Sequence, residues 1–451
     1  MSPPPSSMSG STAGPTLAST LTPHLSTTAS ITTASVTATS PPTPQTASHT
    51  ASHSASPRGV PKVPLWLLAL FTFSGTVAMH IFVPALPFAA ESLGASVGAM
   101  QLTVSLYIAG LAVGQLVYGP LSDHFGRRPV LMVGLVLYTI AGAAASLAPD
   151  AHALIAARLF QALGGCAGLV LGRTIVRDTT SFEESAKRLA LMNLMVTVGP
   201  GVAPIVGAAL ASSLGWRSIF YALTTLGLVN ILLAWKLLPE TGKAAEKANT
   251  NFRALGRNYM ELLKSPRFIG YSIGGGCATT TMYAFIASAP FIFVQQLHRP
   301  THEVGIYLAI LISGIWLGSM LATRLVTRVP MRPLLIASNG VSVVAAFAFL
   351  AAALFGFLSV PWVVGTLFLF TLGAGVASPA ALTEAISVNP RVTGSASGLY
   401  GFTQMTVGAV CTALVGLGSD PALAAGLVMV GAGIVGQASI YVAGRSPISG
   451  K

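Results

Sequence analysis

Twelve long apolar stretches dominate the chain from Leu65 to about residue 443. A stretch of about 20 apolar residues is long enough to cross the hydrocarbon core of a bilayer as an α-helix. Only 8% of the 451 residues are charged, whereas soluble domains carry about 25%. The pattern predicts an all-α membrane protein with twelve transmembrane helices. The predicted spans are about 65–86, 97–118, 130–147, 154–175, 189–214, 219–238, 268–294, 304–322, 334–355, 362–383, 394–417 and 422–443.

Positive charge lies almost entirely on one side of these spans. The clearest example is the short segment 119–129, in which one aspartate and two arginines stand between two uncharged apolar runs. If the amino terminus is cytoplasmic, only Arg217 and Arg299 fall on the outer side. Because short loops rich in Lys and Arg stay in the cytoplasm, we expect both termini to be cytoplasmic. The same distribution accounts for the net charge of +12 without a nucleic-acid partner.

Composition also predicts how the chain is divided. The first 60 residues are rich in Ser, Thr, Pro and Ala and contain no acidic residue, so we expect a disordered cytoplasmic tail. The longest loop follows the sixth span and is predicted to be a cytoplasmic linker. Segment 325–333 resembles segment 121–129 weakly. The two segments are separated by nearly the same number of residues as the first spans of the two sets of six, which favours an internal repeat. The predicted segments are the tail 1–60, a six-helix half 61–240, the linker 241–266, a second six-helix half 267–445 and a C-terminal tail 446–451.

Three motifs resemble the major facilitator superfamily of transporters. Gly119, Asp123, Gly126, Arg127 and Arg128 match its G-x-L-x-D-x-x-G-R-R/K signature between helices two and three. In the fourth span, segment 158–165 resembles R-x-x-Q-G-x-G, and in the fifth, 199–208 resembles the antiporter motif G-x-x-x-G-P-x-x-G-G, with alanine in place of two glycines.

Shorter segments resemble one branch of this superfamily, the Bcr/CflA drug:proton antiporters. They are 84–87 at the end of the first span, 173–178 after the fourth and 215–220 before the sixth. Members of that branch export small antibiotics such as bicyclomycin and chloramphenicol across the bacterial inner membrane in exchange for protons. The resemblance therefore implies a multi-pass inner-membrane protein, usually monomeric, that confers antibiotic resistance by drug efflux.

The signature loop is expected to act in gating. Asp123 lies at the carboxyl end of the second span, where the helix dipole disfavours a negative charge by about 0.3–1 kcal/mol, so Arg127 or Arg128 should compensate it. In the family this carboxylate also faces the amino end of helix eleven, here near Thr393 and Gly394, and locks the cytoplasmic gate. The alternative is that the loop only sets topology.

Three further residues are candidates for coupling or for the cavity. A charge at mid-membrane costs about 2.5–3.5 kcal/mol on insertion scales, so Arg158 should face the cavity. In the family the equivalent arginine belongs to the proton-coupling machinery and, together with the glutamine here numbered Gln161, borders the substrate cavity. Alternatively, Arg158 is hydrogen-bonded to carbonyls of neighbouring helices.

His80 stands where relatives commonly have an aspartate. It either carries the coupled proton, since imidazole titrates near neutrality, or is an uncharged hydrogen-bonding residue.

Shape and polarity select the remaining site candidates. Gly199, Pro204 and Gly207 in the fifth span would let that helix bend and pack closely, either as part of the antiporter function or as ordinary membrane packing. Other polar residues in spans could line the cavity or face a neighbouring helix. These are Gln101, Tyr107, Gln115, Asn193, Tyr283 and Gln404.

The sequence contains no sign of an enzyme or of a cofactor. No nucleotide-binding loop, metal-ligand cluster or nucleophile with a positioned base is present, so we expect no cofactor, no metal and transport driven by a gradient.

No acid lies deep in the first six spans, which favours neutral, zwitterionic or weakly anionic small molecules over lipophilic cations as substrates. The leading hypothesis is proton-coupled export; the alternative is a nutrient or siderophore importer on the same fold.

Overall fold

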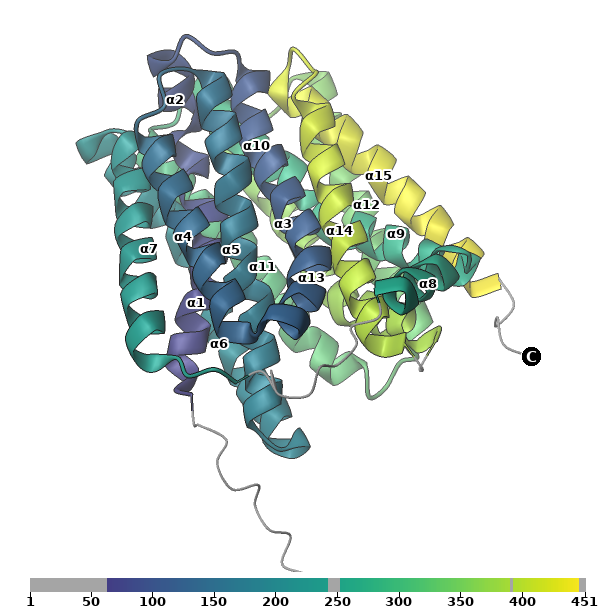
Figure 1. Cartoon of the computed structure of the whole chain (residues 1–451). Coiled ribbons are helices and arrows are strands. Elements are labelled where there is room, and N and C mark those ends of the chain that lie inside the picture. Colours follow the sequence, from purple (N-terminus) through teal and green to yellow (C-terminus); the bar gives the residue numbers. More distant parts are fainter. Residues whose placement is uncertain (1–62, 242–251, 390–391, 446–451) are drawn as a thin grey trace, which may run out of the picture. The chain divides into compact units, whose positions relative to one another are not determined.

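A computed structural model describes residues 63–241, 252–389 and 392–445. The predicted N-terminal tail, the first part of the linker and the C-terminal tail lie outside the described residues. Among the described residues, twelve helical segments are long and apolar enough to cross a membrane, which confirms the predicted number of spans. Most of the described residues lie in helices, and none of them lies in a strand (Figure 1).

In the described residues, seven α-helices and one 3₁₀ helix form the N-terminal half, and seven α-helices and one π-helix form the C-terminal half. The N-terminal half contains α1 (Leu65–Ile81), the short 3₁₀ helix η1 (Val83–Ala85), α2 (Leu86–Ser92), α3 (Val97–Phe125), α4 (Arg127–Ser146), α5 (Ala151–Thr179), α6 (Phe182–Leu214) and α7 (Arg217–Leu237). The linker contributes α8 (Phe252–Leu263). The C-terminal half contains α9 (Pro266–Thr280), α10 (Met282–Phe291), the π-helix η2 (Ile292–Gln296), α11 (Thr301–Leu325), α12 (Met331–Phe355), α13 (Val360–Ser387), α14 (Thr393–Val415) and α15 (Pro421–Arg445).

The first span of each half is interrupted, which the sequence did not predict. In the first, α1 ends at Ile81 and gives way to η1, whose second residue is Pro84. In the seventh, α9 ends before Thr281, and Pro290 precedes the π-helical turn η2. Proline lacks a backbone N–H and clashes with the preceding turn, so it favours such breaks.

Close helix packing holds each half together. In the N-terminal half, α5 packs against α1, α3 and α4, and α1 also packs against α6. Glycines allow this approach: a Cβ at Gly164 would collide with the backbone of Tyr138 in α4, and one at Gly168 would collide with the carbonyl of Phe71 in α1. The C-terminal half repeats the scheme, since α13 packs against α9, α11 and α12.

The two halves meet along two helix pairs, α3 with α14 and α6 with α11. We call the end of the bundle at Gly126 the loop end and the opposite end the far end. Backbones approach closely at the far end. Gly98 of α3 lies against the carbonyl of Gly416. A Cβ at Gly305 of α11 would lie 2.7 Å from the carbonyl oxygen of Pro204 in α6. The far end is therefore tightly closed.

The linker helix α8 lies against the C-terminal half, beside α9 and α14 (Figure 1). Leu262 is its buried anchor, with 1% of its surface exposed. Tyr259 packs near Gly398 of α14, its hydroxyl 3.8 Å from the Cβ position of that glycine. Burial raises the pKa of the Tyr259 phenol, which stays protonated at neutral pH. This contact fixes one end of the connection between the halves.

The glycine contacts give a direct test of packing in α6. A Cβ at Gly207 would collide with the carbonyl oxygen of Ile81 at the end of α1, whereas a Cβ at Gly201 meets nothing within 4 Å. We expect Gly207→Ala to lower the stability of the purified protein by about 1–3 kcal/mol, the range of overpacking in a dense core. Gly201→Ala on the same helix should leave the melting temperature unchanged or raise it slightly, because alanine is the better helix former. Equal melting temperatures for the two variants would contradict the packing role of Gly207.

Candidate functional site

Arg127 organises the signature loop. Its Nη1 donates to Asp123 Oδ1 at 2.5 Å and to Ser122 Oγ at 2.6 Å, and its Nε donates to Asp178 Oδ2 at 2.9 Å. The guanidinium thus joins the end of α3, the start of α4 and the end of α5. Asp123 has 49% of its side chain exposed and Asp178 has 28%, so the cluster lies at the water interface. The prediction that Arg127 or Arg128 compensates Asp123 is confirmed, with Arg127 as the partner.

A second carboxylate, Glu240, closes the loop from the other side. Its Oε1 accepts the backbone N–H of Arg127 at 2.9 Å and its Oε2 accepts that of Arg128 at 3.1 Å. These two N–H groups belong to the first turn of α4, where the helix dipole favours a negative charge. Gly126 leads into this turn with φ +94°, a conformation that favours glycine, and a Cβ there would lie 3.0 Å from Glu240 Oε2. The loop is therefore built around a carboxylate that the motif does not contain.

The remaining signature residues are placed as follows. Arg128 Nη2 donates to the carbonyl oxygen of Trp235 near the end of α7 at 2.8 Å. Gly119 lies within α3, and a Cβ there would meet nothing within 4 Å. At the start of α14, a Cβ at Gly394 would also meet nothing within 4 Å. In this structure Asp123 is bonded to Arg127, and the start of α14 is not packed tightly at Gly394.

Arg158 is fully buried in the N-terminal half, with 0% of its surface exposed. Its Nη1 donates to Oε1 of Gln161 at 2.8 Å, and its Nε and Nη2 have no hydrogen-bond partner in the structure. The guanidinium carbon lies 4.1 Å from the centre of the Tyr107 ring. Sequence reasoning placed Arg158 either at an open cavity or against carbonyl groups. In this structure Gln161 and three aromatic rings lie around it.

A polar network on α1 lies beside Arg158. Tyr107 donates its hydroxyl to the carbonyl oxygen of Gly75 at 2.7 Å, and Tyr138 donates to that of Ser74 at 3.3 Å. Asn230 of α7 donates to Ser74 Oγ at 2.6 Å. Of these residues, the sequence analysis selected only Tyr107. A polar residue such as Asn230 inside an apolar span was the available signal for the others.

His80 lies on α1 where the two halves meet. It is 5% exposed, and its Nδ1 lies 2.9 Å from the carbonyl oxygen of Thr76. Because a carbonyl can only accept, Nδ1 must carry the hydrogen, and Nε2 is then the position at which a neutral ring can bind a proton. The imidazole faces Tyr283 of α10, with ring centres 6.2 Å apart. His80 therefore contacts the C-terminal half.

The other polar candidates divide into contacts between the halves and contacts within one half. Gln101 donates to Ser288 Oγ of α10 at 3.0 Å, and Gln115 Oε1 lies against Gly401 of α14. Gln404 stays within the C-terminal half, since it donates to Thr279 Oγ1 at 2.7 Å. Asn193 on α6 is exposed. Gln101, Gln115, Tyr283 and His80 therefore lie along the surface where the halves meet.

The fifth-span motif makes packing contacts. A Cβ at Gly199 would lie 2.9 Å from the ring of Phe73, and Pro204 lies inside α6 with its carbonyl against Gly305. Gly207 packs on Ile81, as described above. The motif thus touches both α1 and α11, and so contacts both halves.

Acidic side chains are confined to the ends of the spans. The acids in the described membrane-spanning helices all stand within three residues of a helix end: Glu91, Asp123, Asp178, Glu183, Glu184, Glu303 and Glu384. Glu384 pairs with Arg267 at 3.8 Å, as expected for an interfacial ion pair. Within the described residues, no three His, Cys, Asp or Glu side chains are grouped to hold a metal ion.

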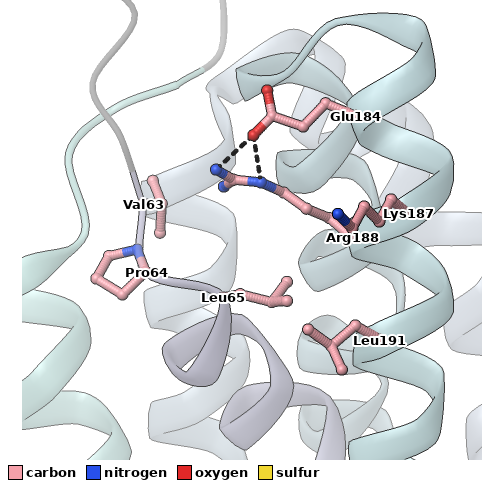
Figure 2. Close-up of a pocket in the computed structure, with 7 residues that line it drawn as sticks. All are labelled: Val63, Pro64, Leu65, Glu184, Lys187, Arg188 and Leu191. Carbon is pink, nitrogen blue, oxygen red and sulfur yellow. Dashed lines mark hydrogen bonds and ion pairs between the residues drawn. The ribbon is translucent and has the colours of Figure 1, made fainter.

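A groove of about 520 Å³ lies at the loop end, between the starts of α1 and α6 (Figure 2). The apolar part of its wall consists of Val63, Pro64, Leu65 and Leu191. The charged part consists of Lys187, Glu184 and Arg188, and Nη2 of Arg188 lies 2.7 Å from Oε1 of Glu184. The groove is open at its rim and contains none of the predicted site residues. It is therefore not the substrate chamber that the sequence predicts.

Comparison with known proteins now identifies the class. The profile of the Major Facilitator Superfamily matches residues 67–412, and the chain belongs to this superfamily. It is 28% identical over 397 residues to the uncharacterized MFS-type transporter YdgK of Bacillus subtilis (strain 168), covering 85% of this chain and 96% of that one.

Other relatives have names that refer to drugs. A bicyclomycin resistance protein homolog of Haemophilus influenzae is 25% identical over 348 residues, which cover 77% of this chain and 87% of the relative. The multidrug transporter MdfA of Escherichia coli O6:H1 is 26% identical over 343 residues, covering 75% and 83% of the two chains.

Solved structures show the same fold. A D-xylose-proton symporter superposes with a TM-score of 0.67 at 14% identity, over 85% of this chain and 97% of that one. A bacterial homolog of the lysosomal transporter Spinster gives a TM-score of 0.63 at 18% identity, over 84% and 96%. The chain is thus a multi-pass membrane transporter of small molecules and not an enzyme.

Proposed function

We propose that this transporter exports small neutral, zwitterionic or weakly anionic drugs or metabolites in exchange for protons, by alternating access across a bacterial inner membrane. The proposed class of substrate is supported by the position of the acidic residues, all of which lie near helix ends in the described spans. An organic cation held between the halves would have no carboxylate partner there and would be badly desolvated. Arg158, a buried cation, adds a positive charge to the N-terminal half.

Export in particular is supported by the fifth span and by the relatives. The antiporter-like motif brings α6 against both α1 and α11 through Gly207 and Pro204. Relatives at 25–26% identity are named for bicyclomycin resistance and multidrug transport. Import on the same fold is the competing function, and the direction of flux separates the two.

In this proposal the structure corresponds to the inward-facing state. The loop end carries the arginines and is cytoplasmic by the positive-inside rule. The far end, where Gly98 meets Gly416 and Gly305 meets Pro204, is then the closed outer gate. The start of α14, near Gly394, is where Asp123 would bind when the inner gate closes. Substrate and protons bias the two states only by binding them with different affinity.

His80 is proposed as the proton carrier. Its Nδ1–H is held by Thr76, which leaves Nε2 to bind a proton, and its ring faces Tyr283 across the interface. A group at this position changes its surroundings when the halves rock apart. Proton release and uptake on opposite sides require such a change.

The export activity can be tested by drug susceptibility. In a host that lacks its main efflux pumps, expression of the chain should raise the inhibitory concentration of at least one uncharged or weakly anionic antibiotic severalfold. Arg158→Ala should abolish the effect at equal membrane abundance, because the buried charge is lost. Whole-cell accumulation of the same compound should fall with wild type. A rise in accumulation would establish import instead.

The gating role of Asp123 has its own test. Asp123→Asn should reduce transport of that compound about tenfold or more while membrane abundance stays near normal, since Arg127 keeps its bond to Asp178. The substitution Glu184→Gln is the control, because it changes an exposed helix-surface ion pair worth about 0.3–0.5 kcal/mol. Wild-type transport by Asp123→Asn would leave the loop with a topological role only.

The proton-carrier role of His80 is tested by driving force. In inverted vesicles, an imposed pH gradient should drive substrate uptake by wild type but not by His80→Ala. Downhill, gradient-free exchange of substrate should persist in the variant, because only coupling is lost. If His80→Ala keeps full pH-driven transport, another group carries the proton.

A further inference from the structure

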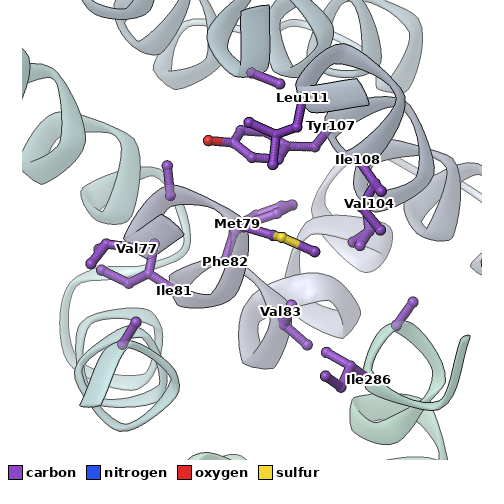
Figure 3. Packing of buried hydrophobic residues seen from close by; sticks show 14 of the residues in the cluster. Val77, Met79, Ile81, Phe82, Val83, Val104, Tyr107, Ile108, Leu111 and Ile286 are labelled. Atoms are coloured by element: carbon purple, nitrogen blue, oxygen red, sulfur yellow. The ribbon is translucent and has the colours of Figure 1, made fainter. Parts of the chain in front are cut away.

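Three aromatic rings surround the guanidinium of Arg158. Its Cζ lies 4.1 Å from the centre of the Tyr107 ring, 5.6 Å from that of Phe82 and 5.8 Å from that of Phe220. Tyr107 belongs to α3, Phe82 to the turn between α1 and η1, and Phe220 to α7. All four side chains have 0% of their surface exposed. Figure 3 shows Phe82 and Tyr107 within a packed cluster of buried apolar residues, which also includes Ile286 of the C-terminal half.

A charge in such a place requires compensation. A buried ion is ordinarily paired with an opposite charge, because removing it from water costs several kcal/mol. Here the hydrogen-bond partner of Arg158 is the neutral amide oxygen of Gln161, and two of its three nitrogens have no hydrogen-bond partner in the structure. The acids of the described spans all lie near helix ends.

The faces of aromatic rings can supply the missing interaction. Their π-electrons make the ring face negative, and a cation within about 6 Å of the ring centre is attracted to it, most strongly when both are desolvated. All three rings meet this distance. Arginine is well suited to the role because its guanidinium is planar and weakly hydrated.

We propose that Phe82, Tyr107 and Phe220 form an aromatic cage that replaces an acidic partner and holds Arg158 as a cation inside the N-terminal half. In the proposed transport cycle, the three rings are positioning residues for Arg158. The cage is a property of the folded chain, so it can be tested without knowledge of the substrate.

The cage also ties Arg158 to α1 on both sides of His80. Tyr107 donates its hydroxyl to the carbonyl oxygen of Gly75, five residues before His80, and Phe82 follows His80 by two residues. Phe82 in turn packs on Phe220, with ring centres 4.8 Å apart. Any displacement of Arg158 therefore moves the part of α1 that carries His80.

The decisive experiment weakens the ring electrostatics without changing the packing. Phenylalanine with one, two or three ring fluorines is introduced at Phe82 or Phe220 of the full-length protein, and its melting temperature is measured after purification. Fluorine withdraws electron density from the ring face while the side chain stays apolar and similar in size. We expect the melting temperature to fall stepwise with each fluorine at either position.

Phe285 is the matched control. It is 1% exposed and packs edge to face on Phe349 in the C-terminal half, with ring centres 5.5 Å apart. The same fluorine series at Phe285 should give no downward trend. Equal trends at positions 82, 220 and 285, or no trend at 82 and 220, would overturn the cage. Because all these proteins retain Arg158, the result does not depend on whether a variant of that residue folds.

Two further measurements sharpen the assignment. In an Arg158→Met background, the fluorine trend at Phe82 should disappear, and persistence of the trend in a folded Arg158→Met protein would overturn the proposal.

Where a transported compound is known, the fluorine series should lower kcat about tenfold from Phe to trifluoro-Phe at Phe82, equivalent to about 1.4 kcal/mol, with little change in KM. This second measurement rests on the proposed function, whereas the melting series does not. A positive melting series without transport would leave the cage intact and remove only the export proposal.

Discussion

The constraint on which this structure depends is that lipid offers neither hydrogen bonds nor solvation of charge. Backbone groups must therefore be satisfied within helices, and ionised side chains must lie at helix ends or be enclosed by compensating groups. The chain follows both requirements. Its acids in the described spans lie within three residues of a helix end, and its buried Arg158 is enclosed by Gln161 and three aromatic rings. The proposed substrate class rests on this near absence of buried negative charge in the described spans.

Close backbone contacts explain how such helices form two stable halves. Glycines at Gly164 and Gly168 bring α5 against α4 and α1, and Gly98 and Gly305 bring the halves together at the far end. Contacts of this kind depend on van der Waals packing, since lipid provides little hydrophobic drive between helices. They are strong when the fit is complete and are lost when the backbones separate by a few ångströms. An interface of this type suits a protein that alternates between two states.

The signature loop links the ends of four helices through hydrogen bonds and ion pairs. Arg127 joins α3, α4 and α5 through Asp123 and Asp178, and Glu240 beyond α7 binds the first turn of α4. The sequence predicted the pairing of Asp123 with an arginine, because the helix dipole disfavours a carboxylate at the carboxyl end of a helix unless a positive charge compensates it. It did not predict Glu240, which is more than a hundred residues away. Only the packing of α7 beside α4 brings that carboxylate to the helix terminus.

The sequence by itself determined the number of spans and the position of the signature loop, because apolar length and local charge are properties of contiguous residues. It also identified Arg158 and His80, since a charged or titratable residue inside an apolar run is visible without a structure. The tertiary structure alone decided what these residues touch, since Phe82, Tyr107 and Phe220 come from three separate elements. The reason is physical. Burial and hydrogen bonding in a membrane bundle are set between helices that are distant in sequence, so the partners of a buried charge follow from packing and not from its local context.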